Sequence, residues 1–148
     1  MDYKRSVVPY VIFSLFKTGM RFGELIALTW EDVNFEEKVI KTYRRYNTST
    51  RQFVPPKNKT SIRTIPISDE EIDILMNIKK SQIRLNKELG IINKNNFIFQ
   101  HYGYVQDIPN NATVNKELKN VLMRLNISPS ITTKGARHTY GSYLWHSQ

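Results

Sequence analysis

The sequence contains no cysteine in its 148 residues. This absence excludes disulfide bonds, thiolate zinc sites and a thiol nucleophile, and it is typical of a cytoplasmic protein. No apolar run approaches the roughly 20 residues that a membrane-spanning helix needs. The first residues, 1–6, lead into no clear signal peptide. We therefore expect a soluble, cytoplasmic protein with no membrane partner.

Acidic residues are also few, with 13 Asp and Glu against 22 Lys and Arg, which gives a formal net charge of +9. A chain this basic that still has 40% hydrophobic residues suggests a folded domain with a polyanionic partner. The stretch 39–63 contains no acid at all. Its cations alternate with aromatic residues, which favours nucleic acid over a merely solvated surface. These cations are Lys41, Arg44, Arg45, Arg51, Lys57, Lys59 and Arg63.

The length is sufficient for one ordinary hydrophobic core, so we expect a single domain over residues 1–148. Apolar residues at helical spacing predict helices at 6–17, from 21 to about 30, at 68–89 and at 113–125. A last helix is expected to begin near residue 134. Strands are expected at 39–46, 51–54 and 63–67, with Pro66 at a sheet edge or strand end. The predicted fold is mainly α with a small three-stranded antiparallel β-sheet.

An arginine begins the second of these helices. Arg21 follows a break at Gly19, and Leu25 and Leu28 lie four and seven residues further on, on one helix face. A buried guanidinium is costly unless an anion faces it. Glu24, three residues on, could be that anion and orient the guanidinium. A purely structural Arg-Glu pair would explain the same spacing.

Two further groups of cations stand at exposed or terminal positions. Lys57 and Lys59 lie in a predicted hairpin turn, and Lys134, Arg137 and His138 lie where the last helix begins and its dipole favours an anion. A phosphodiester in transfer carries negative charge that two guanidiniums and a proton donor can meet without a metal. The acids 69–71 fit a helix N-terminus better than a metal site. We expect a phosphoryl-transfer site with no metal and no cofactor.

These segments resemble the catalytic domain of the tyrosine recombinases, the integrases of phages and conjugative elements. Residues 18–25 are similar to the first arginine box of that family, residues 56–67 to its lysine hairpin and residues 131–139 to its second arginine box. The three segments stand in the family's order and cover nearly the whole chain. The resemblance therefore implies the tyrosine recombinase catalytic-domain fold.

The resemblance also implies roles for individual residues. Arg21 and Arg137 would clamp the scissile phosphate, and Glu24 would support the first arginine. Lys57 would be the general acid for the 5′-oxygen leaving group. Lys59 is the alternative, because a turn shifted by one residue would exchange the two lysines.

The chain departs from the family pattern near its end. Lys134 stands where the family usually has a histidine, so that proton-transfer role would pass to a lysine or weaken, while His138 is expected to be structural. The family's nucleophilic tyrosine lies roughly thirty residues or more beyond the second arginine. Tyr140 and Tyr143 follow Arg137 too soon for this role. We expect the nucleophilic tyrosine, the C-terminal part of the fold and the usual N-terminal DNA-binding domains to be absent from this chain.

The implied activity of the full-length protein is site-specific DNA recombination or integration through a phosphotyrosyl intermediate, as a homo-tetramer on double-stranded DNA. This chain alone is expected to bind DNA without cleaving it. Alternatives are a non-catalytic DNA-binding module and a type IB topoisomerase-like nicking-closing protein. The expected DNA contacts are Arg44, Arg45, Lys59 and Arg63.

Overall fold

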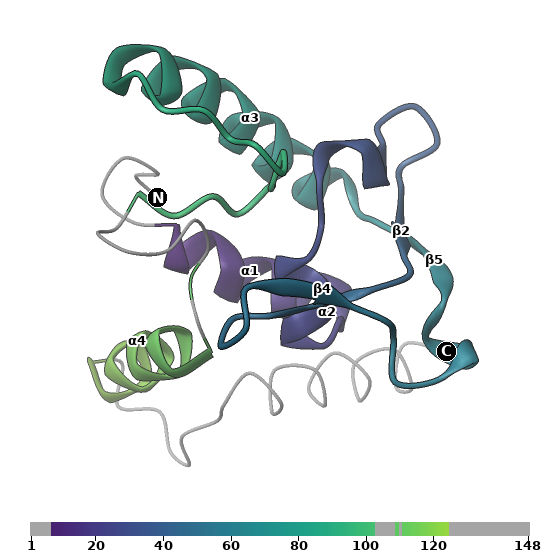
Figure 1. Ribbon diagram of the computed structural model, residues 1–148. Helices are drawn as coiled ribbons and strands as arrows, with labels where there is room; N and C mark the ends of the chain where they lie inside the picture. Colours follow the sequence, from purple (N-terminus) through teal and green to yellow (C-terminus); the bar gives the residue numbers. More distant parts are fainter. Residues whose placement is uncertain (1–6, 103–108, 110, 125–148) are drawn as a thin grey trace.

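The computed structural model describes residues 7–102, 109 and 111–124, which form a helix-rich fold with two small antiparallel sheets (Figure 1). The helices are α1 (Val8–Thr18), α2 (Phe22–Ile26), α3 (Asp69–Leu89) and α4 (Asn111–Arg124), with short 3₁₀ turns η1 (Trp30–Asp32) and η2 (Lys59–Ser61). The strands are β1 (Val33–Asn34), β2 (Val39–Thr42), β3 (Arg45–Asn47), β4 (Gln52–Val54) and β5 (Arg63–Pro66).

Helix α1 lies at the centre of the described part and contacts α2, α3 and α4 (Figure 1). Pro9 is in its first turn, where a missing N–H costs nothing. Val11 and Leu15 are fully buried in the main hydrophobic cluster. Gly19 ends the helix at φ 68°, and its N–H donates to the carbonyl of Leu15 at 3.0 Å. The chain thus turns sharply just before Arg21.

Helix α2 is shorter than we expected, because it ends at Ile26 instead of continuing to about residue 30. The chain beyond it pairs with residues 96–98: the N–H of Ile98 donates to Leu28 and that of Trp30 donates to Asn96, both at 3.1 Å. Thr29 and Phe97 form an isolated antiparallel bridge. The fully buried segment 97–99 needs main-chain partners, and these residues supply them in place of a further helical turn.

The expected strand 39–46 is divided between two sheets. β2 pairs with β1 and β5 in a three-stranded antiparallel sheet of order β1-β2-β5, whereas β3 pairs only with β4. The three-stranded sheet is therefore present, but β1 takes the place that we assigned to residues 51–54. The break lets Tyr46 pack edge-on against Phe53 and Phe97, at 5.1 and 5.2 Å between ring centroids. Pro66 lies at the end of β5, an edge strand, as expected.

Helix α3 follows the expectation closely. Ser68 caps it by accepting a hydrogen bond from the N–H of Glu71 at 3.2 Å, and Gly90 ends it at φ 66°. α4 begins two residues earlier than expected and places Val114 and Leu118 in the core. None of the helices in the described ranges is long and apolar enough to cross a membrane. The expected last helix lies outside the described residues.

Candidate functional site

The main chain of Arg21 is fixed at the N-terminus of α2. Met20 is fully buried, and Arg21 is the extended N-cap residue, with φ −68° and ψ 148°. Its N–H donates to Glu24 Oε1 at 3.1 Å. Its half-buried guanidinium reaches the neighbouring turn, where Nη1 lies 3.4 Å from Ser61 Oγ. Arg21 is therefore held at its backbone, while its guanidinium has only one long contact within the described residues.

Glu24 is only 2% exposed, and its second oxygen pairs with a different arginine. Arg63 Nη1 lies 3.1 Å from Glu24 Oε2, and the same nitrogen donates to the carbonyl of Ser61 at 3.1 Å. This differs from our expectation, which set Glu24 against the guanidinium of Arg21. Glu24 instead bonds the Arg21 main chain and the Arg63 side chain, so one carboxylate joins α2 to β5.

The sequence contains a signal for this pair that we did not use. Side chains alternate between the two faces of a strand, so Arg63 lies on the same face as Ile65. Ile65 is buried and its neighbours Thr64 and Pro66 are exposed. An arginine on the inward face of a strand needs a buried anion. Glu24 is the buried acid that Arg63 contacts, next to the turn of residues 57–61, which we call the lysine turn.

The lysine turn is held together by hydrogen bonds of Asn58, and its lysine side chains are exposed. Asn58 precedes η2, and its side-chain oxygen accepts hydrogen bonds from the hydroxyls of Thr60 and Ser61. The N–H of Ser61 donates to the carbonyl of Asn58 at 3.1 Å. Lys57 and Lys59 are both exposed on either side of Asn58. Asn58, which stands between the two lysines, is linked through Ser61 to Arg21, so Lys57 and Lys59 both remain candidates for the general acid.

Arg44 and Arg45 lie beside each other but are held differently. The Arg44 guanidinium packs over the Phe53 ring at 3.8 Å and the Tyr43 ring at 4.9 Å from the centroids. Its buried Nε has no hydrogen-bond partner among the described residues. Arg45 Nε donates to the carbonyl of Pro55 at 3.0 Å. Both arginines lie at or next to the β3–β4 ribbon, which packs against α2.

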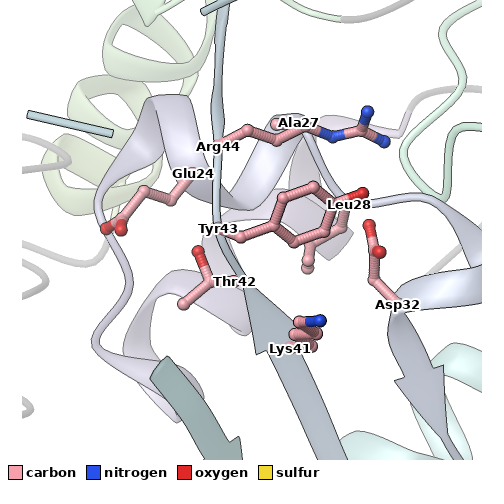
Figure 2. A pocket seen from close by; sticks show the side chains of 8 residues that line it. All are labelled: Glu24, Ala27, Leu28, Asp32, Lys41, Thr42, Tyr43 and Arg44. Carbon is pink, nitrogen blue, oxygen red and sulfur yellow. The ribbon is translucent and has the colours of Figure 1, made fainter. Parts of the chain in front are cut away.

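A small polar pocket lies between α2 and β2 (Figure 2). Figure 2 shows the Tyr43 ring in its middle, with the Asp32 carboxylate directed toward it and the Glu24 carboxylate on the other side. Burial and the neighbouring Asp32 raise the pKa of the Tyr43 hydroxyl. Thr42 Oγ1 is buried there without a hydrogen-bond partner among the described residues. Glu24 and Arg44 both line this pocket.

The first-turn acids of α3 do not behave alike. Asp69 pairs with Lys38 at 2.6 Å and Glu70 with Lys17 at 2.7 Å. Glu71 is buried and accepts a hydrogen bond from Ser14 Oγ at 2.7 Å, and burial raises the pKa of its carboxyl to about 7. We had assigned all three acids to the helix dipole and so missed the buried one. No cluster of His, Cys, Asp or Glu in the described ranges could hold a metal ion.

The structure thus brings together Arg21, Glu24 and the lysine turn, and it adds Ser61 and Arg63 to them. The other predicted site residues, Lys134, Arg137 and His138, lie outside the described residues, as do Tyr140 and Tyr143. The roles of all these residues stay predictions.

Comparison with known proteins defines the class of this fold and site. The chain matches the phage integrase family over residues 6–148, and it belongs to this family, that of the tyrosine recombinases.

Two curated relatives show how the chain relates to whole proteins. It is 29% identical over 144 residues to a tyrosine recombinase XerC-like protein of Caldanaerobacter subterraneus subsp. tengcongensis, covering 88% of this chain and 36% of that protein. It is 30% identical over 135 residues to the ICEBs1 integrase of Bacillus subtilis, covering 88% of this chain and 35% of that protein. The chain therefore spans little more than a third of the length of these relatives.

Solved structures confirm the fold. The Tn1549 transposon integrase in complex with a circular intermediate DNA matches with a TM-score of 0.67 and 24% identity, covering 95% of this chain and 46% of that one. The XerA recombinase matches with a TM-score of 0.66 and 18% identity, covering 97% of this chain and 46% of that one. The predicted fold, the tyrosine recombinase catalytic-domain fold with many helices and a small antiparallel sheet, is confirmed.

Proposed function

We propose that this chain is part of the catalytic domain of a site-specific DNA recombinase, in which Arg21 holds the phosphate that is cut. The observation that carries the proposal is the half-buried Arg21, whose main chain is bonded to the buried Glu24 and whose guanidinium lies beside the lysine turn. An arginine whose main chain is fixed, and whose guanidinium has donors that no described residue uses, fits an incoming anion. Membership of the phage integrase family supports DNA as the source of that anion.

The chemistry follows from the charge of a phosphodiester. A tyrosine hydroxyl gives its proton to water, its oxygen attacks the phosphorus, a phosphotyrosyl bond forms at the 3′ side, and the bond to the 5′-oxygen breaks. Guanidiniums stabilise the added negative charge on the non-bridging oxygens, and this role belongs to Arg21 together with Arg137. The leaving 5′-oxygen takes a proton from Lys57, with Lys59 as the alternative. We assign no residue of this sequence as the attacking tyrosine.

Arg44, Arg45 and Lys59, which we call the outer basic surface, supply the remaining contacts with double-stranded DNA. Arg44 and Arg45 lie at the β3–β4 ribbon, on the acid-free stretch of the chain, and Lys59 projects from the turn. The similar Tn1549 integrase was solved in complex with DNA, which supports the same partner here. As a homo-tetramer on paired sites, the whole protein would exchange strands between two duplexes.

The experiment that tests this proposal separates cleavage from binding. In the recombinase that carries this chain, Arg21→Ala should slow formation of the covalent protein–DNA complex by about 10²–10³-fold, as expected for loss of one transition-state donor. DNA affinity should fall much less. Arg45→Ala is the matched control, because it removes an arginine from the outer surface and should weaken binding more than it slows the step on bound DNA. Equal effects of both variants on affinity, with no specific loss of cleavage, would favour the non-catalytic DNA-binding module.

A further inference from the structure

The lysine turn and the Arg21 guanidinium are joined through two side chains. Arg21 Nη1 lies 3.4 Å from Ser61 Oγ, and this hydroxyl donates to Asn58 Oδ1 at 3.0 Å. Asn58 stands between Lys57 and Lys59 in the sequence. Ser61 is 5% exposed, so its hydroxyl lies within the packed base of the turn. A displacement of Ser61 would therefore move the guanidinium contact and the lysines together.

Arg63 connects this turn to Glu24 on α2. Its Nη1 reaches both Glu24 Oε2 and the carbonyl of Ser61, at 3.1 Å each. Glu24 is buried, so its carboxylate is costly to bury unless a cation and hydrogen-bond donors face it, and here Arg63 and the N–H of Arg21 do so. The side chain of Arg63 is 31% exposed, much less open than a surface cation such as Lys38 at 52%.

We propose that Arg63 is a positioning residue and not a direct phosphate contact, an inference that rests on the proposed function of Arg21. Its guanidinium neutralises Glu24, which fixes the Arg21 main chain, and it keeps Ser61 and the lysine turn beside Arg21. A phosphate at Arg63 would have to share the charge of this guanidinium with the buried Glu24 carboxylate. This assignment replaces the DNA contact that the sequence suggested for Arg63.

A charge-removal series in the recombinase that carries this chain tests the proposal. Arg63→Gln should slow cleavage of bound DNA by roughly tenfold to a hundredfold, since it removes the charge-assisted hydrogen bond between Arg63 and the buried Glu24 carboxylate. The dependence of DNA affinity on salt should keep its slope. The double variant Glu24→Gln with Arg63→Gln removes both charges and should cleave faster than Arg63→Gln alone.

Two arginines serve as matched controls in the same measurement. Arg45→Gln removes a charge from the outer basic surface and should lower the salt slope by about one. Arg84→Gln removes one from the exposed side of α3 and should change neither slope nor cleavage. Arg63→Lys keeps the charge with poorer geometry and should fall between wild type and Arg63→Gln.

A second readout does not depend on activity. Hydrogen exchange at the amide of Arg21 should speed up in Arg63→Gln by roughly tenfold and slow again in the double variant, because the Glu24 bond protects this N–H. If the wild-type protein does not cleave DNA, the proposed function fails while this exchange still reports on positioning. If Arg63→Gln lowers the salt slope by about one and the double variant recovers neither cleavage nor protection, Arg63 is a phosphate contact and the proposal is overturned.

Discussion

The buried carboxyl of Glu71 shows how one side chain can make stability depend on pH. It lies between α3 and α1, where Ser14 donates to one oxygen and Lys17 is the nearby cation. The other oxygen has no partner among the described residues. Burial raises the pKa from 4.5 to about 7, so the folded state binds this proton more tightly than the unfolded chain does.

The sign of the effect follows from this difference. The stability contributed by the neutral carboxyl is fully present below pH 4.5 and is lost as pH rises through about 7. Glu71→Gln stays neutral and can keep the bond with Ser14. Relative to wild type, it should therefore gain about 2–3 kcal/mol in free energy of unfolding between pH 4 and pH 8. Urea denaturation at several pH values measures this, and a difference that does not change with pH would contradict it.

At the scale of elements, buried polar bonds decide where α2 ends. Gln82 on α3 is 4% exposed and accepts a hydrogen bond from Trp30 Nε1 at 2.7 Å. Its amide donates to the carbonyls of Phe97 and Ile98 at 3.1 and 3.2 Å. One side chain thus joins α3 to Trp30 at the start of η1 and to the main chain of residues 97–98.

Replacing this side chain by an apolar one of similar size should loosen that junction. Gln82→Leu removes the acceptor of the Trp30 indole N–H and one hydrogen bond to each of the Phe97 and Ile98 carbonyls, so it should lower the free energy of unfolding by about 3 kcal/mol. Chemical denaturation measures the loss. Gln→Leu at the exposed position Gln52 is the control and should change stability little. Similar small losses in both variants would show that Gln82 does not hold the junction.

Helix ends that depend on hydrogen bonds between near neighbours could be predicted from the sequence, whereas ends that depend on distant residues could not. Ser68 and Gly90 delimit α3 by capping bonds between near neighbours in the sequence, and Gly19 ends α1 in the same way. The end of α2 and the division of strand 39–46 depend on Phe97, which lies far along the chain. The spacing of Arg21 and Glu24 placed both at the site. Strand alternation places their partner Arg63 on the inward face of β5, but it lies 39 residues from Glu24, and periodicity within one element does not identify Glu24 as the acid that it meets.

At the scale of the whole molecule, two pairs of arginines in the described residues are held in different ways. Arg44 and Arg45 lie at the ribbon, where aromatic rings and a main-chain carbonyl hold them. Arg21 and Arg63 lie on either side of a buried carboxylate. A net charge of +9 favours binding to a polyanion, and within the described part of the chain it is Arg21 in the second group that we propose for the reacting phosphate.

The most direct test compares cleavage of ordinary DNA with that of DNA whose scissile 5′-oxygen is replaced by sulfur, in the recombinase that carries this chain. A thiolate leaves without a proton, so the sulfur substrate does not need the general acid. Lys57→Ala should slow cleavage of ordinary DNA by about 10²–10³-fold and regain most of its rate on the sulfur substrate.

Arg21→Ala should stay slow on both substrates, because the charge on the phosphate oxygens is the same in each. If sulfur rescues Lys59→Ala and not Lys57→Ala, Lys59 is the general acid, and the proposed role of Arg21 is unchanged. Rescue of Arg21→Ala by sulfur, or full activity of this variant on ordinary DNA, would contradict the central claim that Arg21 holds the scissile phosphate.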